Sequence, residues 1–173
     1  LDDGEWVLNG SKIFITSAPY AGVFAVFALT YKEAPKGKGI SCFLVEAGTK
    51  GLSIGKEEHK MGQRASATNE VIFDNCRVPA DALLGTLNTG FSSAAEGLAG
   101  SRINIGSLAL GIGLAAMDYS AGYATQRAQF GQKISGFQAV QWMIADSYTE
   151  LEAARLLLMN AAARREAGKS HTK

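Results

Sequence analysis

The spacing of apolar residues changes near Pro79, and this change limits the chain to a β part followed by an α part. Before it, short apolar runs such as VFAVFALTY, GISCFLVE and NEVIFDNCRVP are separated by segments rich in Gly, Pro and Lys, which is typical of antiparallel strands. After it, apolar residues recur every three or four positions, as on one face of a helix. We therefore expect a small antiparallel barrel or sandwich over residues 1–82 and an α-helical hairpin over residues 83–173.

The first two apolar runs predict a hairpin. Asn9-Gly10 lies between EWVL and SKIFIT, and this pair readily adopts the two positive φ angles of a tight turn. The strands that it joins would open the β part of the chain.

The second part predicts two long helices. Ile105, Leu108 and Ile112 recur at helical spacing in the first helix, among glycines that each cost up to about 1 kcal/mol relative to alanine. Such glycines are tolerated where packing supports the helix or another group approaches closely. The second helix has an apolar face made of Val140, Ile144, Leu151 and Leu158. Two helices alone cannot bury both faces, so we expect half of a four-helix bundle.

Charge and cysteine content argue against several classes of function. The net charge of +1 lacks the basic surplus of a nucleic-acid binder. No apolar run is as long as a membrane span, so no membrane partner is expected. Cys42 and Cys76 are interpreted as buried thiols of a reducing compartment, and His59 and His171 as surface residues, so no metal site is expected.

The ends of the sequence predict a piece of a longer protein. The chain begins at LDDGEWVLNG without a methionine, and it stops soon after a strong helical pattern. Its charged content of 19% is low for a free-standing domain, which favours a surface covered by a neighbouring subunit or by other parts of the chain.

Four motifs in order carry a family resemblance: LNGSKIFITSA, KMGQRASATNEVIFDNCRVPADALLG, GSRINIGSLALGIG and QRAQFGQKISGFQAVQWMIAD. With them the chain resembles the acyl-CoA dehydrogenase family over essentially its whole length, and isobutyryl-CoA and short branched-chain members look most similar. The resemblance implies an N-terminal helical domain, a central β-domain and a C-terminal four-helix bundle. This chain would supply the β-domain and the first two bundle helices, without the N-terminal domain and the end of the bundle.

The resemblance also implies a reaction, the FAD-dependent α,β-dehydrogenation of an acyl-CoA thioester. A carboxylate takes the α-proton, the flavin takes the β-hydrogen as hydride, and electrons pass to an electron-transfer flavoprotein. The expected setting is fatty acid or branched-chain amino acid catabolism, in the cytoplasm of a bacterium or the mitochondrial matrix of a eukaryote. The expected assembly is a homotetramer, a dimer of dimers.

Phe14, Ile15 and Thr16 occupy family positions along the flavin ring system. The resemblance implies that Thr16 donates a hydrogen bond near the flavin N5, which favours the charge arriving with the hydride. Phe14 stands where the family often has tryptophan, so it keeps an aromatic face but lacks the indole N–H. From the residues alone, KIFIT is an ordinary strand with Phe14 in the core; its family position predicts cofactor binding.

A polar and aromatic hinge separates the two predicted helices. By resemblance, Arg127 and Gln129 contact the FAD pyrophosphate of a neighbouring subunit, where a guanidinium offers several donors to phosphate. Phe130 belongs to the QFG turn, Phe137 packs at the start of the next helix, and Gln138 offers an amide to the adenosine portion. Taken alone, Arg127 would be interpreted as a solvated helix cap.

Ser101 and Arg102 are the predicted substrate-binding residues. The resemblance places Arg102 beside the acyl-CoA, whereas from the residues alone a paired or exposed structural arginine serves equally well. Some family members carry the catalytic glutamate immediately before this arginine, where Ser101 stands here. Most others carry it on a later helix, so we expect the base beyond residue 173 and no activity from this chain alone. Ala99 replaces a family aspartate that contacts CoA.

Two other classes of function remain open. An acyl-CoA oxidase or a flavin monooxygenase relative would use the same scaffold and differ in oxygen access and substrate pocket. A non-catalytic oligomerisation module would have lost its base, and the sequence downstream of residue 173 discriminates it from an enzyme.

Overall fold

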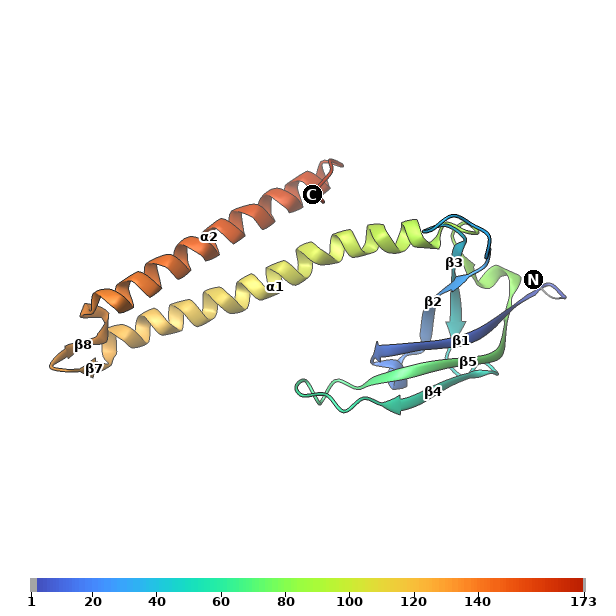
Figure 1. Cartoon of the computed structure of the whole chain (residues 1–173), viewed down its shortest axis with the longest axis horizontal. Coiled ribbons are helices and arrows are strands. Elements are labelled where there is room, and N and C mark those ends of the chain that lie inside the picture. Colours follow the sequence, from blue (N-terminus) through green and yellow to red (C-terminus); the bar gives the residue numbers. More distant parts are fainter. Residues whose placement is uncertain (1–2, 173) are drawn as a thin grey trace. The chain divides into compact units, whose positions relative to one another are not determined.

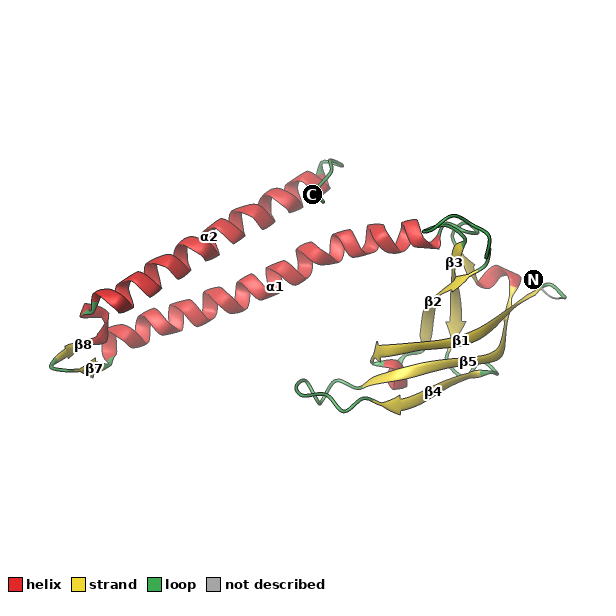
Figure 2. Cartoon of the chain, viewed as in Figure 1, coloured by secondary structure: helices red, strands yellow, loops and turns green. Residues whose placement is uncertain are grey.

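Two three-stranded sheets form the β part of the computed structural model, which describes residues 3–172 (Figures 1 and 2). The first sheet has the order β1 (Glu5–Thr16), β5 (Thr68–Pro79), β4 (Leu52–Glu57). The second has the order β2 (Val23–Leu29), β3 (Ile40–Glu46), β6 (Leu83–Leu84). All of these pairings are antiparallel, and two short 3-10 helices follow β1 and β5, namely η1 (Ala18–Tyr20) and η2 (Ala80–Ala82).

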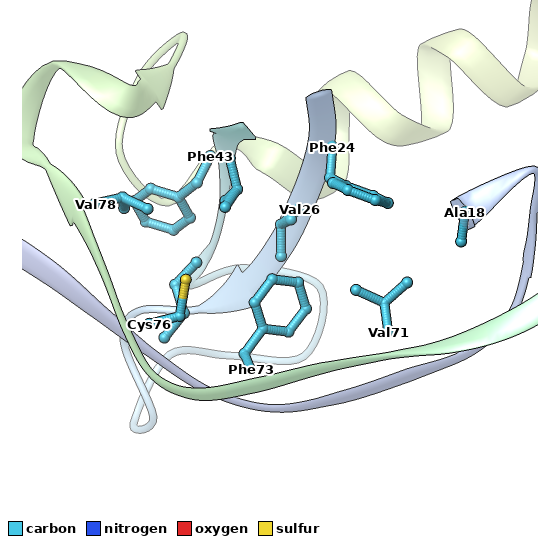
Figure 3. Close-up of a cluster of buried hydrophobic side chains, with 10 residues drawn as sticks. Ala18, Phe24, Val26, Phe43, Val71, Phe73, Cys76 and Val78 are labelled. Atoms are coloured by element: carbon cyan, nitrogen blue, oxygen red, sulfur yellow. The ribbon is translucent and has the colours of Figure 1, made fainter. Parts of the chain in front are cut away.

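The core lies between these two sheets, whose apolar side chains point toward one another (Figure 3). Phe43 and Val45 of β3 are fully buried, and Trp6 of β1 packs on Phe43 with ring centroids 5.2 Å apart. The strands do not close on themselves among the described residues. Of the two expected forms, the structure therefore shows the sandwich and no closed barrel.

The Asn9-Gly10 pair does not form the predicted hairpin. β1 continues through it from Glu5 to Thr16 and pairs throughout with β5. Between Leu8 and Gly10 the register shifts because β5 has one residue more than β1, so a β-bulge of β5 at Asp74 and Asn75 lies opposite the pair. The Asn75 backbone N–H of this bulge donates to Asn9 Oδ1 at 2.8 Å, so the Asn9 side chain supports the bulge from the neighbouring strand.

Both cysteines are buried free thiols, as predicted. Burial raises the pKa of Cys42 and of Cys76, so both stay protonated and unreactive near neutral pH. His59 is exposed as expected, but His171 is half-buried and its Nε2 has no hydrogen-bond partner among the described residues. The described residues contain no His, Cys, Asp and Glu group able to hold a metal ion.

The α part is a helical hairpin. Its elements are α1 (Gly90–Gln126), β7 (Ala128–Gln129), β8 (Gln132–Lys133), the 3-10 helix η3 (Ile134–Gly136) and α2 (Gln138–Glu166) (Figure 2). The chain divides into two units, Leu1–Ala95 and Glu96–Lys173, and each is described by itself. The domain boundary expected after residue 82 stays a prediction.

Glycines of α1 make room for side chains of α2. A Cβ at Gly106 would lie 2.8 Å from a methyl group of Leu158, and a Cβ at Gly113 would lie 2.8 Å from one of Leu151. The predicted apolar face of α2 therefore packs on glycines, and Ile105 and Ile112 of α1 are each 64% exposed. A helical hairpin with an unburied apolar stripe is what half of a bundle should show.

No segment long and apolar enough to span a membrane was expected from the sequence, but α1 is such a segment. It has 37 residues, and by length and composition alone it is apolar enough to cross a membrane. Its apolar residues are interspersed with polar ones, which is why counting uninterrupted runs missed it. Core helices of soluble proteins pass the same test, so the absence of a membrane partner stays a prediction.

Candidate functional site

The predicted flavin motif lies on a distorted stretch of β1. The register runs from Lys12↔Val71 to Ile15↔Asn69, so β1 has one residue more than its partner strand there. Phe14 takes up this bulge with a φ of 60°, a left-handed conformation that is unusual for an aromatic residue. Its side chain is 65% exposed, so the reading of Phe14 as a core residue is wrong.

Thr16 is exposed at the end of the same strand, directly beyond this bulge. Its register partner on β5 is Thr68, and the next amide, that of Ser17, donates to the carbonyl oxygen of Ala67 at 2.8 Å. A cavity of about 380 Å³ borders this end of the strand, lined by Ile15, Thr16 and apolar residues of β2 and β5. Thr16 thus presents a hydroxyl to a mostly apolar hollow, and the exposed Phe14 lies two residues before it on the same strand.

Lys60, which is not among the predicted site residues, reaches the same place. Its Nζ donates to Thr68 Oγ1 at 2.9 Å and to the carbonyl oxygen of Ser66. Since Thr68 pairs with Thr16, this puts a positive charge one strand away from the predicted flavin motif. A lysine in a polar loop gives no signal by itself, and only the fold connects it to Thr16.

The hinge between α1 and α2 contains a short β-hairpin with a two-residue loop. Phe130 and Gly131 have φ angles of 52° and 80°, as a type I′ turn requires, and they join β7 to β8. The Arg127 backbone is held on both sides, because its N–H donates to Tyr123 O and its carbonyl accepts from the Ile134 N–H, each at 2.9 Å. Its side chain is exposed.

Two aromatic residues of the hinge contact each other. Phe130 is 93% exposed, and its ring meets that of Phe137 edge to face at a centroid distance of 6.3 Å. Gln129 and Gln138 are exposed on either side of this pair, at β7 and at the first residue of α2. The structure therefore brings all five predicted hinge residues to one end of the helical hairpin.

Lys133, which is not among the predicted site residues, is a further cation at this end of the hairpin. Its Nζ donates to the carbonyl oxygen of Gln126 at 2.8 Å, at the negative end of the α1 dipole. Lys133 pairs across the hairpin with Ala128, the residue that follows the exposed Arg127. An exposed guanidinium beside exposed aromatic rings and amides suits a ligand that carries phosphate and planar rings, so the residues present fit FAD.

Ser101 and Arg102 lie far from the hinge along α1. Arg102 and Gln126 are 24 residues apart (126 − 102), which is about 36 Å at 1.5 Å per residue. Ser101 Oγ donates to Gly97 O at 3.0 Å, an ordinary bond within the helix. Arg102 is exposed and lines a hollow of about 400 Å³ with Ala99, Leu158 and His171. One copy therefore cannot bring Arg102 and the hinge to the same small ligand.

Comparison with known families matches both parts of the chain. Residues 1–76 match the family model described as acyl-CoA dehydrogenase, middle domain, and residues 88–173 match the one described as acyl-CoA dehydrogenase, C-terminal domain. Residues 77–87, between the two matches, contain the end of β5 and all of η2 and β6.

Three known proteins show how far the similarity extends. The chain is 51% identical to acryloyl-CoA reductase (NADH) of Anaerotignum propionicum, over 98% of this chain and 43% of that protein. A solved structure titled "Electron transferring flavoprotein of Acidaminococcus fermentans: Towards a mechanism of flavin-based electron bifurcation" aligns with a TM-score of 0.90 at 45% identity. The alignment covers 99% of this chain and 45% of the other. The FAD complex of PigA aligns with a TM-score of 0.92 at 31% identity, over 99% and 44%. The chain thus spans less than half the length of the proteins it matches.

Proposed function

The chain belongs to the acyl-CoA dehydrogenase family, and from this premise we propose that the protein removes two hydrogens from the α and β carbons of an acyl-CoA thioester. Bound FAD would supply the hydride acceptor. The observation that carries the proposal is the bulge of β1, which holds Phe14 in a strained, exposed conformation beside Thr16. Strain of this kind in a strand is typical of a ligand-binding site.

Each flavin-side residue has a separate task in this proposal. Phe14 offers its exposed ring to the flavin face, and Ile15 packs beneath it against the core. Thr16 donates from its hydroxyl or amide, which stabilises negative charge on the cofactor. The Lys60 ammonium, fixed by Thr68, adds positive potential on the same side.

The hinge residues serve the cofactor of a second copy. Arg127 donates to the pyrophosphate, Gln129 and Gln138 offer amides, and the Phe130–Phe137 pair provides an apolar wall. The distance of about 36 Å along α1 between Arg102 and the end of the helix supports this division between copies. Such sharing requires at least two copies, and the assembly is proposed to be a homotetramer, a dimer of dimers.

The substrate side is assigned to Ser101 and Arg102, with the catalytic base beyond residue 173. The Ser101 hydroxyl donates to the Gly97 carbonyl oxygen of its own helix, and a hydroxyl is not the carboxylate that the reaction needs as its base. Arg102 is exposed and can pair with a polar group of the acyl-CoA. This chain alone is accordingly proposed to be inactive, and the carboxylate that takes the α-proton belongs to the rest of the protein.

Electrons are proposed to leave through an electron-transfer flavoprotein. The similarity to a structure from a study of such a flavoprotein in Acidaminococcus fermentans supports this partner. The relative from Anaerotignum propionicum is named as a reductase, which is the reverse sense of the same bond change, so both directions belong in the assay. Location in the bacterial cytoplasm or the mitochondrial matrix and preference for a short branched acyl chain are also proposals.

The test uses the full-length protein, purified with its cofactor. We expect a visible flavin spectrum that is bleached under anaerobic conditions by butyryl-CoA or isobutyryl-CoA, and recovery of colour when electron-transfer flavoprotein is added. Rapid reoxidation by oxygen with release of peroxide would favour the oxidase instead. A protein that binds no flavin would support the non-catalytic module and overturn the proposal.

A further inference from the structure

Lys60 binds both neighbours of Ala67 with one ammonium group. Its side chain is half-buried, and its Nζ donates to the carbonyl oxygen of Ser66 and to Thr68 Oγ1, the latter at 2.9 Å. Ala67 and Thr68 are each 8% exposed. A hydrogen bond from a charged donor is stronger than one between neutral groups, and burial strengthens it further. One cation therefore fixes three consecutive residues, 66–68.

The segment fixed in this way contacts the end of β1 directly. The Ser17 N–H donates to the carbonyl oxygen of Ala67 at 2.8 Å, and Thr68 is the register partner of Thr16. Both contacts lie just beyond the bulge at Phe14, which interrupts the regular ladder between β1 and β5. Since the bulge bends the strand there, the direction of Thr16 depends on the contacts that follow it.

The loop that carries Lys60 has few other means of keeping its shape. It covers residues 58–67 between β4 and β5, and most of its side chains are exposed, with Met61 98% exposed. The Glu58 N–H donates to Thr68 O at 2.8 Å, and Arg64 Nε donates to Lys60 O at 3.1 Å. A loop with few buried apolar contacts opens easily, so the half-buried Lys60 side chain is a main restraint on it.

We propose that Lys60 is a positioning residue for the flavin, in addition to the positive potential that its charge supplies. By holding residues 66–68 it fixes Thr16 in the orientation in which its donor group meets the cofactor. Lys60 acts through the end of β1 and does not itself need to touch the flavin. This inference rests on the proposed function, because it takes Thr16 as the residue that donates a hydrogen bond to the flavin.

The test compares four variants of the full-length protein. Lys60→Met removes the ammonium group and keeps the apolar stem, whereas Thr68→Val keeps the ammonium and removes one of its acceptors. Thr68→Ser restores that acceptor. Lys56→Met is the control for charge, because Lys56 is an exposed lysine of β4 whose side chain has no hydrogen bond to any residue that the structure describes.

Three quantities are measured for each variant: amide hydrogen exchange of Ser17 in the flavin-free protein, the Kd for FAD by titration of that protein, and the visible spectrum of the bound flavin. Exchange in the flavin-free protein reports the Ser17–Ala67 bond without any cofactor. The spectrum reports the hydrogen bonding of the flavin ring system, which a general loss of stability would leave unchanged.

With Lys60→Met we expect the exchange of Ser17 and the Kd for FAD each to rise at least about tenfold, as loss of charge-assisted hydrogen bonds predicts. The visible bands of the flavin should shift. Thr68→Val should change all three quantities in the same direction and to a smaller extent, because one of the two acceptors remains. Thr68→Ser and Lys56→Met should stay close to the wild type.

Three results would overturn the inference. Unchanged Ser17 exchange in Lys60→Met, or faster exchange spread evenly over the chain, would show that Lys60 does not restrain the end of β1. A wild-type Kd and spectrum in Thr68→Val would show that Lys60 acts on the flavin by its charge alone, as would equal losses in Lys60→Met and Lys56→Met. A wild type that binds no flavin would instead overturn the proposed function, and this inference with it.

Discussion

Two phenylalanines adopt left-handed backbone conformations and expose their rings, and both belong to the residues predicted to bind FAD. Phe14 has a φ of 60° with 65% exposure, and Phe130 has a φ of 52° with 93% exposure. Asparagine or glycine would adopt such a backbone conformation at a lower free-energy cost. Exposing the apolar surface of an aromatic ring to water is also unfavourable. A conformation that is costly in both respects is best explained by a ligand or partner surface that covers the ring.

The strain at Phe14 can be measured by comparing two truncations. Both Phe14→Gly and Phe14→Ala remove the ring, but only glycine relieves the left-handed backbone. We expect Phe14→Gly to be more stable than Phe14→Ala by about 1 kcal/mol in urea unfolding of the flavin-free protein. Both should bind flavin more weakly than the wild type. Equal stabilities would show that the bulge stores no strain.

Arg127 and Arg102 should differ in which ligand they hold. Loss of a charge-assisted bond to phosphate costs about 1.5–3 kcal/mol, so Arg127→Gln should weaken FAD binding by roughly tenfold to a hundredfold. Arg102→Gln should leave FAD binding unchanged and raise the KM for acyl-CoA. Flavin titration of the apoprotein and steady-state kinetics of the reconstituted enzyme separate the two effects. An equal loss of FAD in both variants would contradict the division of roles.

At the scale of elements, periodicity alone predicted a strand-rich part followed by a helix-rich part, and the structure confirms both. The apolar face of α2 was also predictable, because Leu151 and Leu158 share one face of the helix and pack on glycines of α1. The interruptions of regular structure were not predictable. Asn9-Gly10 favours a turn locally, but pairing along β5 outweighs that preference, and the irregularity is a bulge of β5 opposite the pair. The partner of Lys60 depends on the fold and carries no local signal.

The start of α1 offers a prediction at this scale. Gly90→Ala would bring a Cβ within 2.9 Å of the β3 backbone, which cannot move aside as a side chain can, so we expect a loss of about 1–3 kcal/mol. Gly97→Ala is the matched control in the same helix, because a Cβ there meets nothing within 4 Å. Helix propensity alone should then stabilise the protein by up to about 1 kcal/mol. Thermal unfolding of the full-length variants measures both, and a neutral Gly90→Ala would contradict the close approach.

At the scale of the whole molecule, the helical hairpin cannot be a finished structure by itself. Most of the large apolar side chains of its helices are exposed, including Ile105, Ile112, Trp142 and Leu157, and among the hairpin residues that the structure describes only Ala124 is a buried apolar side chain. Its two sets of predicted ligand-binding residues lie about 36 Å apart along α1. We propose that further helices cover the apolar stripe and that the hinge of one copy reaches the flavin motif of another.

Mixing two damaged proteins tests this sharing between copies. Phe14→Ala damages the flavin side and Arg127→Gln damages the hinge, so each full-length variant alone should lose most of its activity. A mixed pair contains one site with both defects and one with neither. Random reassembly makes about half of the pairs mixed, so activity should recover to about a quarter of the wild-type value.

The recovery depends on which copy supplies the hinge. If Arg127 served the flavin site of its own chain, every site in a mixed pair would carry one defect, and mixing would restore nothing. Dissociation and reassembly of each variant alone is the control, because it exposes any gain caused by the treatment itself. Recovery in the mixture alone would require that the exposed hinge of one copy, with Arg127 and the Phe130–Phe137 pair, completes the cofactor site of its neighbour.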